Sequence, residues 1–314
     1  MASIIETGAA GEITLPAAPR RRKRKLSTDG WWPWAFVLPS FVGIVIFAVW
    51  PILRTIYMSF TEAGPFGGEH WVGLANYITM LTDPNVGWAI LNSLEFTGIG
   101  LLGIPISMVL ASIIGRPGFR LARFYRVLFF LPFIAMPVAI TLVWRMIFNG
   151  NFGIVNQALA LVGIKGPYWL STPGVLIVVI SLIGVWGGIG FNMIVLSAGL
   201  KSIPADYYEA AELDGASKPR QFFSITVPLV SPTVFFLVVM QIIGGFQVFT
   251  ALYVMMGNNN PQMAKSQTLV YLFYNQGFTL NHVGYAASIA VLILVIIGVI
   301  TAAQFVLQKK WVFQ

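Results

Sequence analysis

Six long apolar segments follow one another along the chain, separated by polar intervals. They run over about Trp31–Phe60, Leu91–Ile114, Val127–Phe148, Pro173–Leu200, Leu229–Met256 and Tyr285–Leu307. Each is long enough, at about 1.5 Å per residue, to cross a hydrocarbon core of roughly 30 Å. Strand-like alternation of polar and apolar positions is absent. The pattern therefore predicts an all-α integral membrane protein with six transmembrane helices.

The longest polar interval, Lys201–Pro228, lies between the fourth and fifth apolar segments. It carries four of the eleven acids, and because charges are costly at bilayer depth, it lies outside the membrane. We expect two short helices here, each with a proline in its first turn. Ser202 would cap the first helix and Gly215 would end it, and Ser217 would cap the second. The interval thus predicts a helical hairpin between two spans.

Composition supports a membrane protein and offers little for catalysis. The mean hydropathy is +0.79 and 10% of residues are charged, whereas a soluble domain is about one quarter charged. The chain has no cysteine and two histidines, which excludes disulfides and cysteine-ligated metals. No HExxH, Walker A or GxSxG pattern occurs. We therefore predict no catalytic residue, no metal site and no cofactor on this chain.

The basic residues gather in alternate intervals and so predict the topology. Residues 1–30 hold the run Arg20–Lys25, the interval between the second and third segments holds four arginines, and residues 308–314 hold two lysines. Residues 61–90 hold no basic residue. The positive-inside rule places both termini and the hairpin in the cytoplasm. The net charge of +8 fits a surface beside anionic membrane lipid better than nucleic-acid binding.

We call residues 1–30 the arm. We expect the arm to be disordered and the loops on the external side of the membrane to be folded. The arm is polar and small, which predicts a mostly disordered cytoplasmic segment that fixes topology; a specific lipid or protein contact is the alternative. The opposite loops carry aromatic and amide residues, among them Asn258–Asn260. We expect these loops to be folded, with a short helix near Leu74–Leu81.

The hairpin carries a pattern that resembles a known family. Glu209-Ala210-Ala211 is followed by Gly215 after three residues and by Ile225 after nine more, and then by Val227-Pro228. This resembles the EAA-x3-G-x9-I-x-L-P pattern of the permease subunits of bacterial binding-protein-dependent ABC importers; Val227 stands where leucine is usual. Further stretches resemble the sugar and glycerol-phosphate branch, and the likeness covers nearly all of residues 35–307: Leu38-Pro39-Ser40, Trp50-Pro51-Ile52, Trp71–Tyr77, Asn92-Ser93-Leu94 and Gly284–Ala287. Gly257–Pro261 departs from the family's usual glycine-rich turn.

The resemblance implies the fold of a type I importer permease, and an upstream, maltose-permease-like subunit of a heterodimeric pair in the bacterial plasma membrane. It implies a second homologous permease, an extracytoplasmic solute-binding protein, and two ATPase subunits that hold ATP and Mg. The first helix of the hairpin would be the coupling helix that docks on an ATPase. The residues expected in this contact are Tyr207, Tyr208, Glu209, Ala210, Ala211, Asp214 and Gly215. Small alanines permit close approach, and a carboxylate can pair with a basic partner residue.

Amides and aromatics in the fourth and fifth segments are candidates for the substrate pathway, because sugar hydroxyls need donors and acceptors and sugar rings stack on aromatic faces. The set is Trp186, Asn192, Gln241, Phe246, Gln247 and Tyr253, together with Glu95 in the second segment. Glu95 either faces the pathway or pairs with a neighbouring helix. For any one of the others, packing between helices is the preferred interpretation, but as a set we expect some to line the pathway.

Other functions remain as alternatives. An ABC permease for a solute other than a sugar would carry the same hairpin. An ion-coupled secondary transporter would need intramembrane acids or broken helices, and Glu95 is its one candidate acid. A membrane-embedded enzyme would need a clustered nucleophile, base or metal set, which the two histidines do not supply. The sequence does not name the sugar.

Overall fold

The computed structural model describes residues 32–64, 67–116, 118–257 and 263–311. The arm, residues 312–314 and Asn258–Asn260 lie outside this range, so the predictions made for them are not tested. The chain divides into two units, Met1–Pro51 and Ile52–Gln314. The first contains helix α1, Trp32–Ile44, a π-helical turn η1, Val45–Val49, and the start of α2, Trp50–Met58. Pro51 cannot donate a backbone hydrogen bond, and the helix widens to π geometry just before it.

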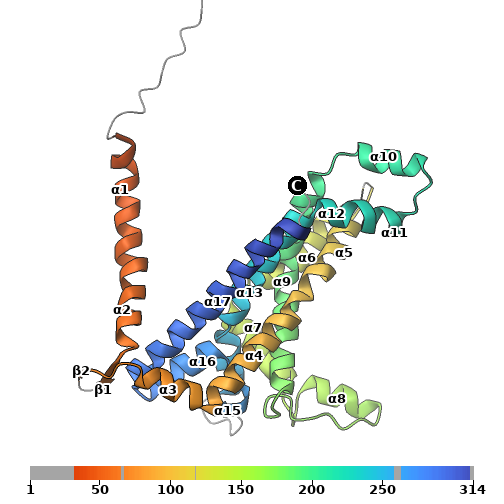
Figure 1. Cartoon of the computed structure of the whole chain (residues 1–314). Helices are drawn as coiled ribbons and strands as arrows, with labels where there is room; N and C mark the ends of the chain where they lie inside the picture. Colours follow the sequence, from red (N-terminus) through yellow and green to blue (C-terminus); the bar gives the residue numbers. More distant parts are fainter. Residues whose placement is uncertain (1–31, 65–66, 117, 258–262, 312–314) are drawn as a thin grey trace, which may run out of the picture. The chain divides into compact units, whose positions relative to one another are not determined.

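Long apolar helices dominate the second unit (Figure 1). They are α4, Pro84–Leu101, with α5, Gly103–Ile114; α9, Val175–Lys201; α13, Ser231–Phe246, with α14, Thr250–Met256; and α17, Val283–Trp311. With Pro33–Met58, the described residues hold five helices that could cross a membrane, or six if the bent pair α6 and α7 is one span. The second span begins earlier than predicted because Asp83 caps it, accepting a hydrogen bond from the Asn85 backbone nitrogen at 2.9 Å. The last helix extends to Trp311, into the predicted tail.

The third span, predicted over Val127–Phe148, is broken near Pro137, one of its two prolines. Helix α6, Ala122–Ile134, and helix α7, Pro137–Ile147, meet at 95°. Ala135 and Met136 are extended, with ψ of 150° and 119°. A proline disfavours helical geometry at the preceding residue, so Pro137 ends one helix and begins the next.

The fifth span is interrupted as well. Helix α13 ends at Phe246, and α14 begins at Thr250 after an irregular Phe249 (φ −138°, ψ −58°). Two glycines, Gly244 and Gly245, lie near the end of α13, where they could permit a kink or close packing. A Cβ on Gly245 would lie 2.4 Å from Thr97 Oγ1, so Gly245 permits close packing of α13 against α4. The break itself falls two residues later.

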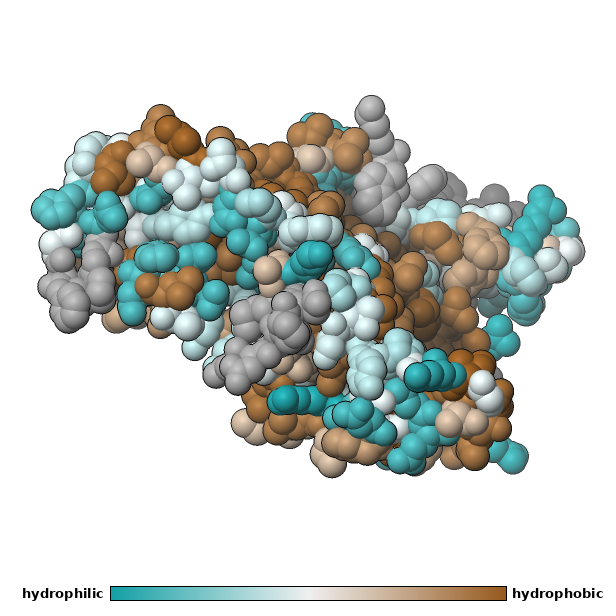
Figure 2. Space-filling model, turned by 90° about the horizontal axis from the view of Figure 1, so that it is seen from below, coloured by the Kyte–Doolittle hydropathy of each residue, from teal (hydrophilic) through white to brown (hydrophobic). Residues whose placement is uncertain are grey.

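One end of the second unit carries several short elements, and we call it the distal end because it lies opposite the hairpin (Figure 1). They are strands β1, Thr61–Gly64, and β2, Gly67–Trp71, and helices α3, Ala75–Thr82, α8, Ile154–Leu161, α15, Met263–Ser266, α16, Leu269–Tyr274, and the π-turn η3, Asn275–Thr279. Helix α3 confirms the one predicted near Leu74–Leu81. The antiparallel pair β1–β2 was not predicted. Figure 2 views this end, where polar and apolar residues are both exposed.

Helix α9 lies at the centre of the packing of the second unit. It contacts α4, α5, α6 and α13. At one end, Met193 and Leu196 pack in a buried cluster with residues of α5 and α13. At the other, Leu176 and Ile180 pack against α14. Helix α9 therefore joins the distal end to the hairpin without a break.

Asn92 ties the distal segment 265–269 to helix α4. It is buried, and its amide nitrogen donates to the carbonyl oxygens of Lys265 at 3.0 Å and Gln267 at 2.9 Å. The neighbouring Ser93 hydroxyl accepts from the Leu269 backbone nitrogen at 3.1 Å. The two side chains thus replace backbone hydrogen bonds that this loop cannot make for itself.

Replacing Asn92 by leucine should loosen this segment. The change leaves two carbonyls without their donor, which costs about 1–3 kcal/mol. We expect faster amide hydrogen exchange over residues 263–269 and a lower unfolding temperature. Gly87→Ala on the same helix, where a Cβ would meet nothing within 4 Å, is the control. Unchanged exchange in Asn92→Leu would show that the loop is held by other contacts.

Candidate functional site

The Lys201–Pro228 interval folds as the predicted helical hairpin. Its helices are α10, Asp206–Leu213, and α11, Lys218–Gln221, which continues through the π-turn η2, Phe222–Thr226, and α12, Val227–Leu229, toward α13. Gly215 ends α10 as predicted, with φ +71°. The Ala216 nitrogen donates to the Ala211 carbonyl at 2.9 Å and the Gly215 nitrogen to the Glu212 carbonyl at 3.0 Å, which is a Schellman ending.

The predicted caps need correction. Ser202 does not cap α10: its hydroxyl donates to the Gly199 carbonyl at 2.7 Å, at the end of α9. Helix α9 runs on to Lys201, so α10 begins later, with Ala205 at the N-cap position. Ser217 does occupy the N-cap position of α11, but its side chain makes no capping hydrogen bond.

Contacts between its two helices hold the hairpin together. The Tyr208 hydroxyl lies 2.9 Å from Thr226 Oγ1, and Lys218 forms an ion pair with Glu212. The buried Gln221 donates from its amide nitrogen to the Ala216 carbonyl at 3.1 Å. The hairpin is thus held in one conformation by its own contacts.

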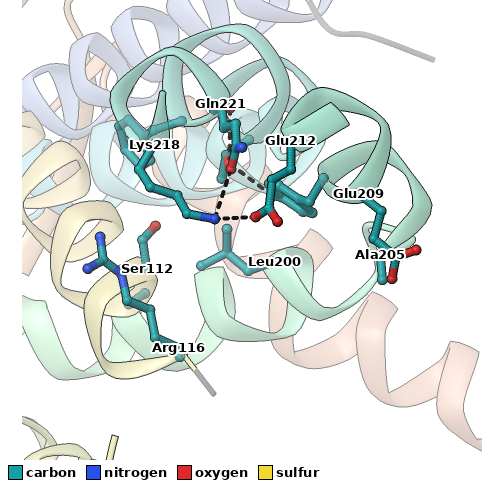
Figure 3. A pocket seen from close by; sticks show the side chains of 13 residues that line it. Ser112, Arg116, Leu200, Ala205, Glu209, Glu212, Lys218 and Gln221 are labelled. Atoms are coloured by element: carbon teal, nitrogen blue, oxygen red, sulfur yellow. Dashed lines mark hydrogen bonds and ion pairs between the residues drawn. The ribbon is translucent and has the colours of Figure 1, made fainter. Parts of the chain in front are cut away.

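A cavity of about 610 Å³ lies between the hairpin and the ends of two spans (Figure 3). Ala111, Ser112, Gly115 and Arg116 line it from the end of α5, and Leu200 lines it from α9. The arginine-containing interval after α5 and the hairpin therefore lie at the same end of the unit, as the charge pattern requires. In Figure 3, Lys218 and Glu212 point toward each other, whereas Glu209 points away from this pair.

The residues predicted for the coupling contact differ in how far they are exposed. Tyr207, Glu209, Ala210, Asp214 and Gly215 are exposed, and Tyr208 and Ala211 are half-buried. Within the described part of the chain, no hydrogen bond or ion pair holds the Glu209 carboxylate. Glu209 and Ala210 lie three or four positions from Leu213, so the three share one face of α10. Leu213 is 91% exposed and was not predicted as part of the site, although an apolar residue inside a polar interval was a signal.

Gly215 should resist replacement by a side chain that disfavours the left-handed conformation. A Cβ there would meet nothing within 4 Å, but φ is positive, so the cost is conformational, about 1–2 kcal/mol. We expect Gly215→Val to increase proteolysis of the hairpin, and Gly215→Asn to do so much less, because asparagine tolerates this conformation. Equal sensitivity of the two variants would contradict the assignment.

Two of the amides predicted for the pathway approach the same span. A Cβ on Gly100 would lie 2.1 Å from Gln241 Nε2, and one on Gly103 would lie 3.6 Å from Asn192 Nδ2. Gly100 and Gly103 are three positions apart, at the junction of α4 and α5. Gln241 from α13 and Asn192 from α9, both half-buried, therefore face one stretch of the second span.

The aromatic candidates lie apart from these amides. Trp186 packs edge-on against Trp144 with ring centroids 5.4 Å apart, and lines an apolar cavity of about 370 Å³ at the α6–α7 break. Tyr253 belongs to an aromatic cluster with Phe249, Tyr271 and Tyr274. Burial raises the pKa of Tyr271, and a hydrogen bond with Tyr253 raises the pKa of Tyr274. Both hydroxyls therefore stay protonated at neutral pH.

The remaining candidates separate into buried and open positions. Phe246 is 1% exposed and packs in a core cluster with Met80, Leu269 and Ile289, so in this chain it contributes packing and lines no surface. Gln247, in the break after α13, and Glu95 are exposed. The structure thus brings Gln241 and Asn192 together, and does not gather all seven candidates around one cavity.

A bundle of apolar spans with a polar hairpin at one end defines a multi-pass membrane protein. Residues 103–312 match the family described as the inner membrane component of binding-protein-dependent transport systems. The chain belongs to this family. It is therefore a multi-pass inner-membrane protein, and by its family a transport component rather than an enzyme.

Curated relatives match over nearly their whole length. A probable ABC transporter permease protein, YesP of Bacillus subtilis, is 35% identical over 93% of this chain and 95% of its own. AraP of the same organism, the permease protein of an arabinooligosaccharides transport system, is 31% identical over 89% of both chains. UgpA of Agrobacterium fabrum, from an sn-glycerol-3-phosphate transport system, is 33% identical over 88% of this chain and 94% of its own.

The fold is that of a solved importer. A crystal structure of a bacterial ABC transporter involved in the import of the polysaccharide alginate has a chain that matches with a TM-score of 0.78 at 23% identity, covering 89% of this chain and 96% of that one. The predicted class, an all-α membrane protein with the fold of a type I importer permease, is thereby confirmed.

Proposed function

We propose that this chain is one of two transmembrane subunits of an ATP-driven importer, and that it forms with a second, similar permease the pathway for a sugar or sugar-like solute. An external binding protein delivers the solute at the distal end. Two ATPase subunits, which hold ATP and Mg²⁺, dock at the hairpin end. The observation that carries the proposal is the exposed α10 face with the EAA-x3-G spacing, on a hairpin that is held by its own contacts.

The orientation of the chain follows from this assignment. The hairpin and the arginine-containing interval after α5 line one cavity, and the C-terminal part of α17 reaches the same end, where Phe305 packs against Phe235 at 5.4 Å. Positive charge marks the cytoplasmic side. We therefore assign the hairpin and the C-terminus to the cytoplasm and β1–β2, α3 and α8 to the outer side. The basic run Arg20–Lys25 predicts a cytoplasmic N-terminus as well.

A carbohydrate is the solute class that the chain's relatives favour. The named systems of two relatives transport arabinooligosaccharides and sn-glycerol-3-phosphate. Neutral amides and tyrosine hydroxyls, here Gln241, Asn192 and the cluster around Tyr253, suit hydroxyl groups. A solute other than a sugar is the second candidate. Ion-coupled transport is disfavoured by membership of a binding-protein-dependent family.

Co-purification and stimulated ATP hydrolysis test the proposal. The chain should be expressed with the products of its neighbouring genes, reconstituted in lipid, and assayed with the partner binding protein loaded with each of a panel of saccharides. We expect an ATPase to co-purify and one saccharide class to stimulate hydrolysis. Transport by the chain without an ATPase would overturn the importer assignment; stimulation only by a non-carbohydrate would overturn the sugar assignment.

Gln241 should affect substrate affinity if its face lines the pathway. We expect Gln241→Ala and Gln247→Ala to raise the substrate concentration for half-maximal transport, since losing a hydrogen bond costs about 1 kcal/mol, roughly fivefold. Gly100→Ala should affect the same site, because its Cβ would occupy the position of the Gln241 amide and displace that side chain. Unchanged affinity in Gln241→Ala and Gln247→Ala would remove this face from the pathway.

A further inference from the structure

The short distal helix α8, Ile154–Leu161, has an exposed apolar stripe, while its Val155 and Leu159 are half-buried. Ile154 is 66% exposed and Leu161 is 89% exposed, and Ala158 between them is also exposed. The spacing of four and three residues places all three on one stripe of the helix. The stripe continues past the helix end into Val162 and Ile164, which are exposed on either side of a turn at Gly163 with φ +76°.

The polar side chains of α8 are bound within its own loop. Asn156 accepts from the Trp169 indole nitrogen at 2.6 Å and donates to the Gly150 carbonyl at 2.8 Å. The Gln157 amide donates to the Phe152 carbonyl at 3.1 Å. Gln157 is exposed, but α8 also leaves an apolar stripe uncovered, whereas a surface helix in water buries its apolar stripe.

The position of α8 in the chain keeps it beside the membrane. Its loop leaves α7 at Ile147 and enters α9 at Val175, so both of its ends are fixed where spans leave the bilayer. In Figure 1, α8 runs across the direction of α9 rather than along it. A helix held at this level with an apolar stripe fits the boundary between lipid headgroups and acyl chains.

The composition of the loop favours lipid as the occupant over a charged protein surface. Residues 149–172 contain no acid and one base, Lys165. Tyr168 in the same loop is exposed. Tyrosine, tryptophan and a flanking lysine are the residues that mark the membrane–water interface, and the lysine can reach lipid phosphates.

We propose that α8 lies flat in the lipid interface at the distal end, with Ile154, Ala158 and Leu161 in the acyl boundary and Lys165 at the level of the lipid phosphates. The surface is separate from the hairpin and from the pathway candidates. Its occupant is phospholipid, not a second protein.

The absence of cysteine allows a direct test. Leu161→Cys, and Ile154→Cys as a second position on the stripe, are labelled with an environment-sensitive fluorophore in the complex with which the chain co-purifies. The complex is placed in phosphatidylcholine–phosphatidylglycerol vesicles. Asn151→Cys, an exposed polar position in the same loop, is the control. The label is quenched by lipid-attached nitroxide or by aqueous iodide.

We expect the labels at Leu161 and Ile154 to be quenched several-fold more strongly by nitroxide lipid than by iodide, and the label at Asn151 to show the reverse. Iodide quenching of Leu161 equal to that of Asn151 would place the stripe in water and overturn the proposal. Protection from both quenchers, or loss of lipid quenching when binding protein is added, would identify a protein occupant and overturn it as well.

Discussion

Gly190→Ala should destabilise the protein more than alanine at any other glycine of α9. The Cβ would lie 2.2 Å from the Phe129 carbonyl oxygen and 2.5 Å from the Phe130 Cα of α6. Both are backbone atoms, so no side-chain rotation can relieve the contact and the two helices must separate. Overpacking of this kind costs about 1–3 kcal/mol. The expected result is a lower unfolding temperature in detergent, measured by fluorescence-detected size exclusion, and reduced yield of assembled complex.

The same helix provides a matched control. A Cβ on Gly187 or Gly188 would meet nothing within 4 Å. Alanine favours helix over glycine by about 1 kcal/mol, so Gly187→Ala and Gly188→Ala should be neutral or slightly stabilising. If Gly190→Ala behaved like these two, the close crossing of α6 and α9 would not contribute to stability.

Glu209→Ala is expected to leave the protein folded and to uncouple ATP hydrolysis from transport. The carboxylate is exposed and lacks a partner in the described part of the chain, so its loss removes no contact that stabilises the fold. At the proposed ATPase contact, truncating one member of a desolvated charge pair costs about 2–5 kcal/mol. Transport should fall at least tenfold, while unfolding temperature and expression stay at the wild-type level. Solute uptake and ATP hydrolysis measured in the same vesicles give the coupling ratio.

Glu212→Ala is the control for charge removal on the same helix. The Glu212 partner, Lys218, lies within the hairpin, and the side chains of Glu212 and Lys218 are 56% and 69% exposed. An exposed ion pair contributes roughly 0–1 kcal/mol, so this variant should transport nearly as well as the wild type. Equal losses in Glu209→Ala and Glu212→Ala would indicate a general need for negative charge, and wild-type coupling in both would contradict the docking role.

Local rules predicted the hairpin well because it is a local structure. The residue that ends α10 adopts the left-handed conformation, which costs glycine little, and Gly215 stands at this position. The position of Ser217 before a proline predicted the start of α11 in the same way. Ser202 failed as a cap because α9 runs as far as Lys201, which makes Ser202 its C-cap residue, and α10 begins only at Asp206.

Tertiary contacts determine the features of the fold that local sequence patterns did not predict. Pro137 signals a helix boundary, but the angle of 95° depends on how α6 packs on α9 and α7 on α14. The strands β1 and β2 are short and lack alternation; they are positioned by Asn76, which donates to the Ser59 and Thr61 carbonyls. Phe246 and Gln241 both lie on α13, yet their surroundings made one of them core and left the other half-open.

Helix α9 has a mechanical consequence for the whole bundle. It runs from Val175 to Lys201 without interruption, so its 27 residues form a rod of roughly 40 Å at 1.5 Å per residue. Two of the spans that pack beside it are interrupted, at Ala135–Met136 and at Gln247–Phe249. A tilt of about 5° at the hairpin end of such a rod displaces its far end by roughly 3.5 Å. Helix α9 can thus act as a lever arm, with the interrupted spans as the joints that yield around it.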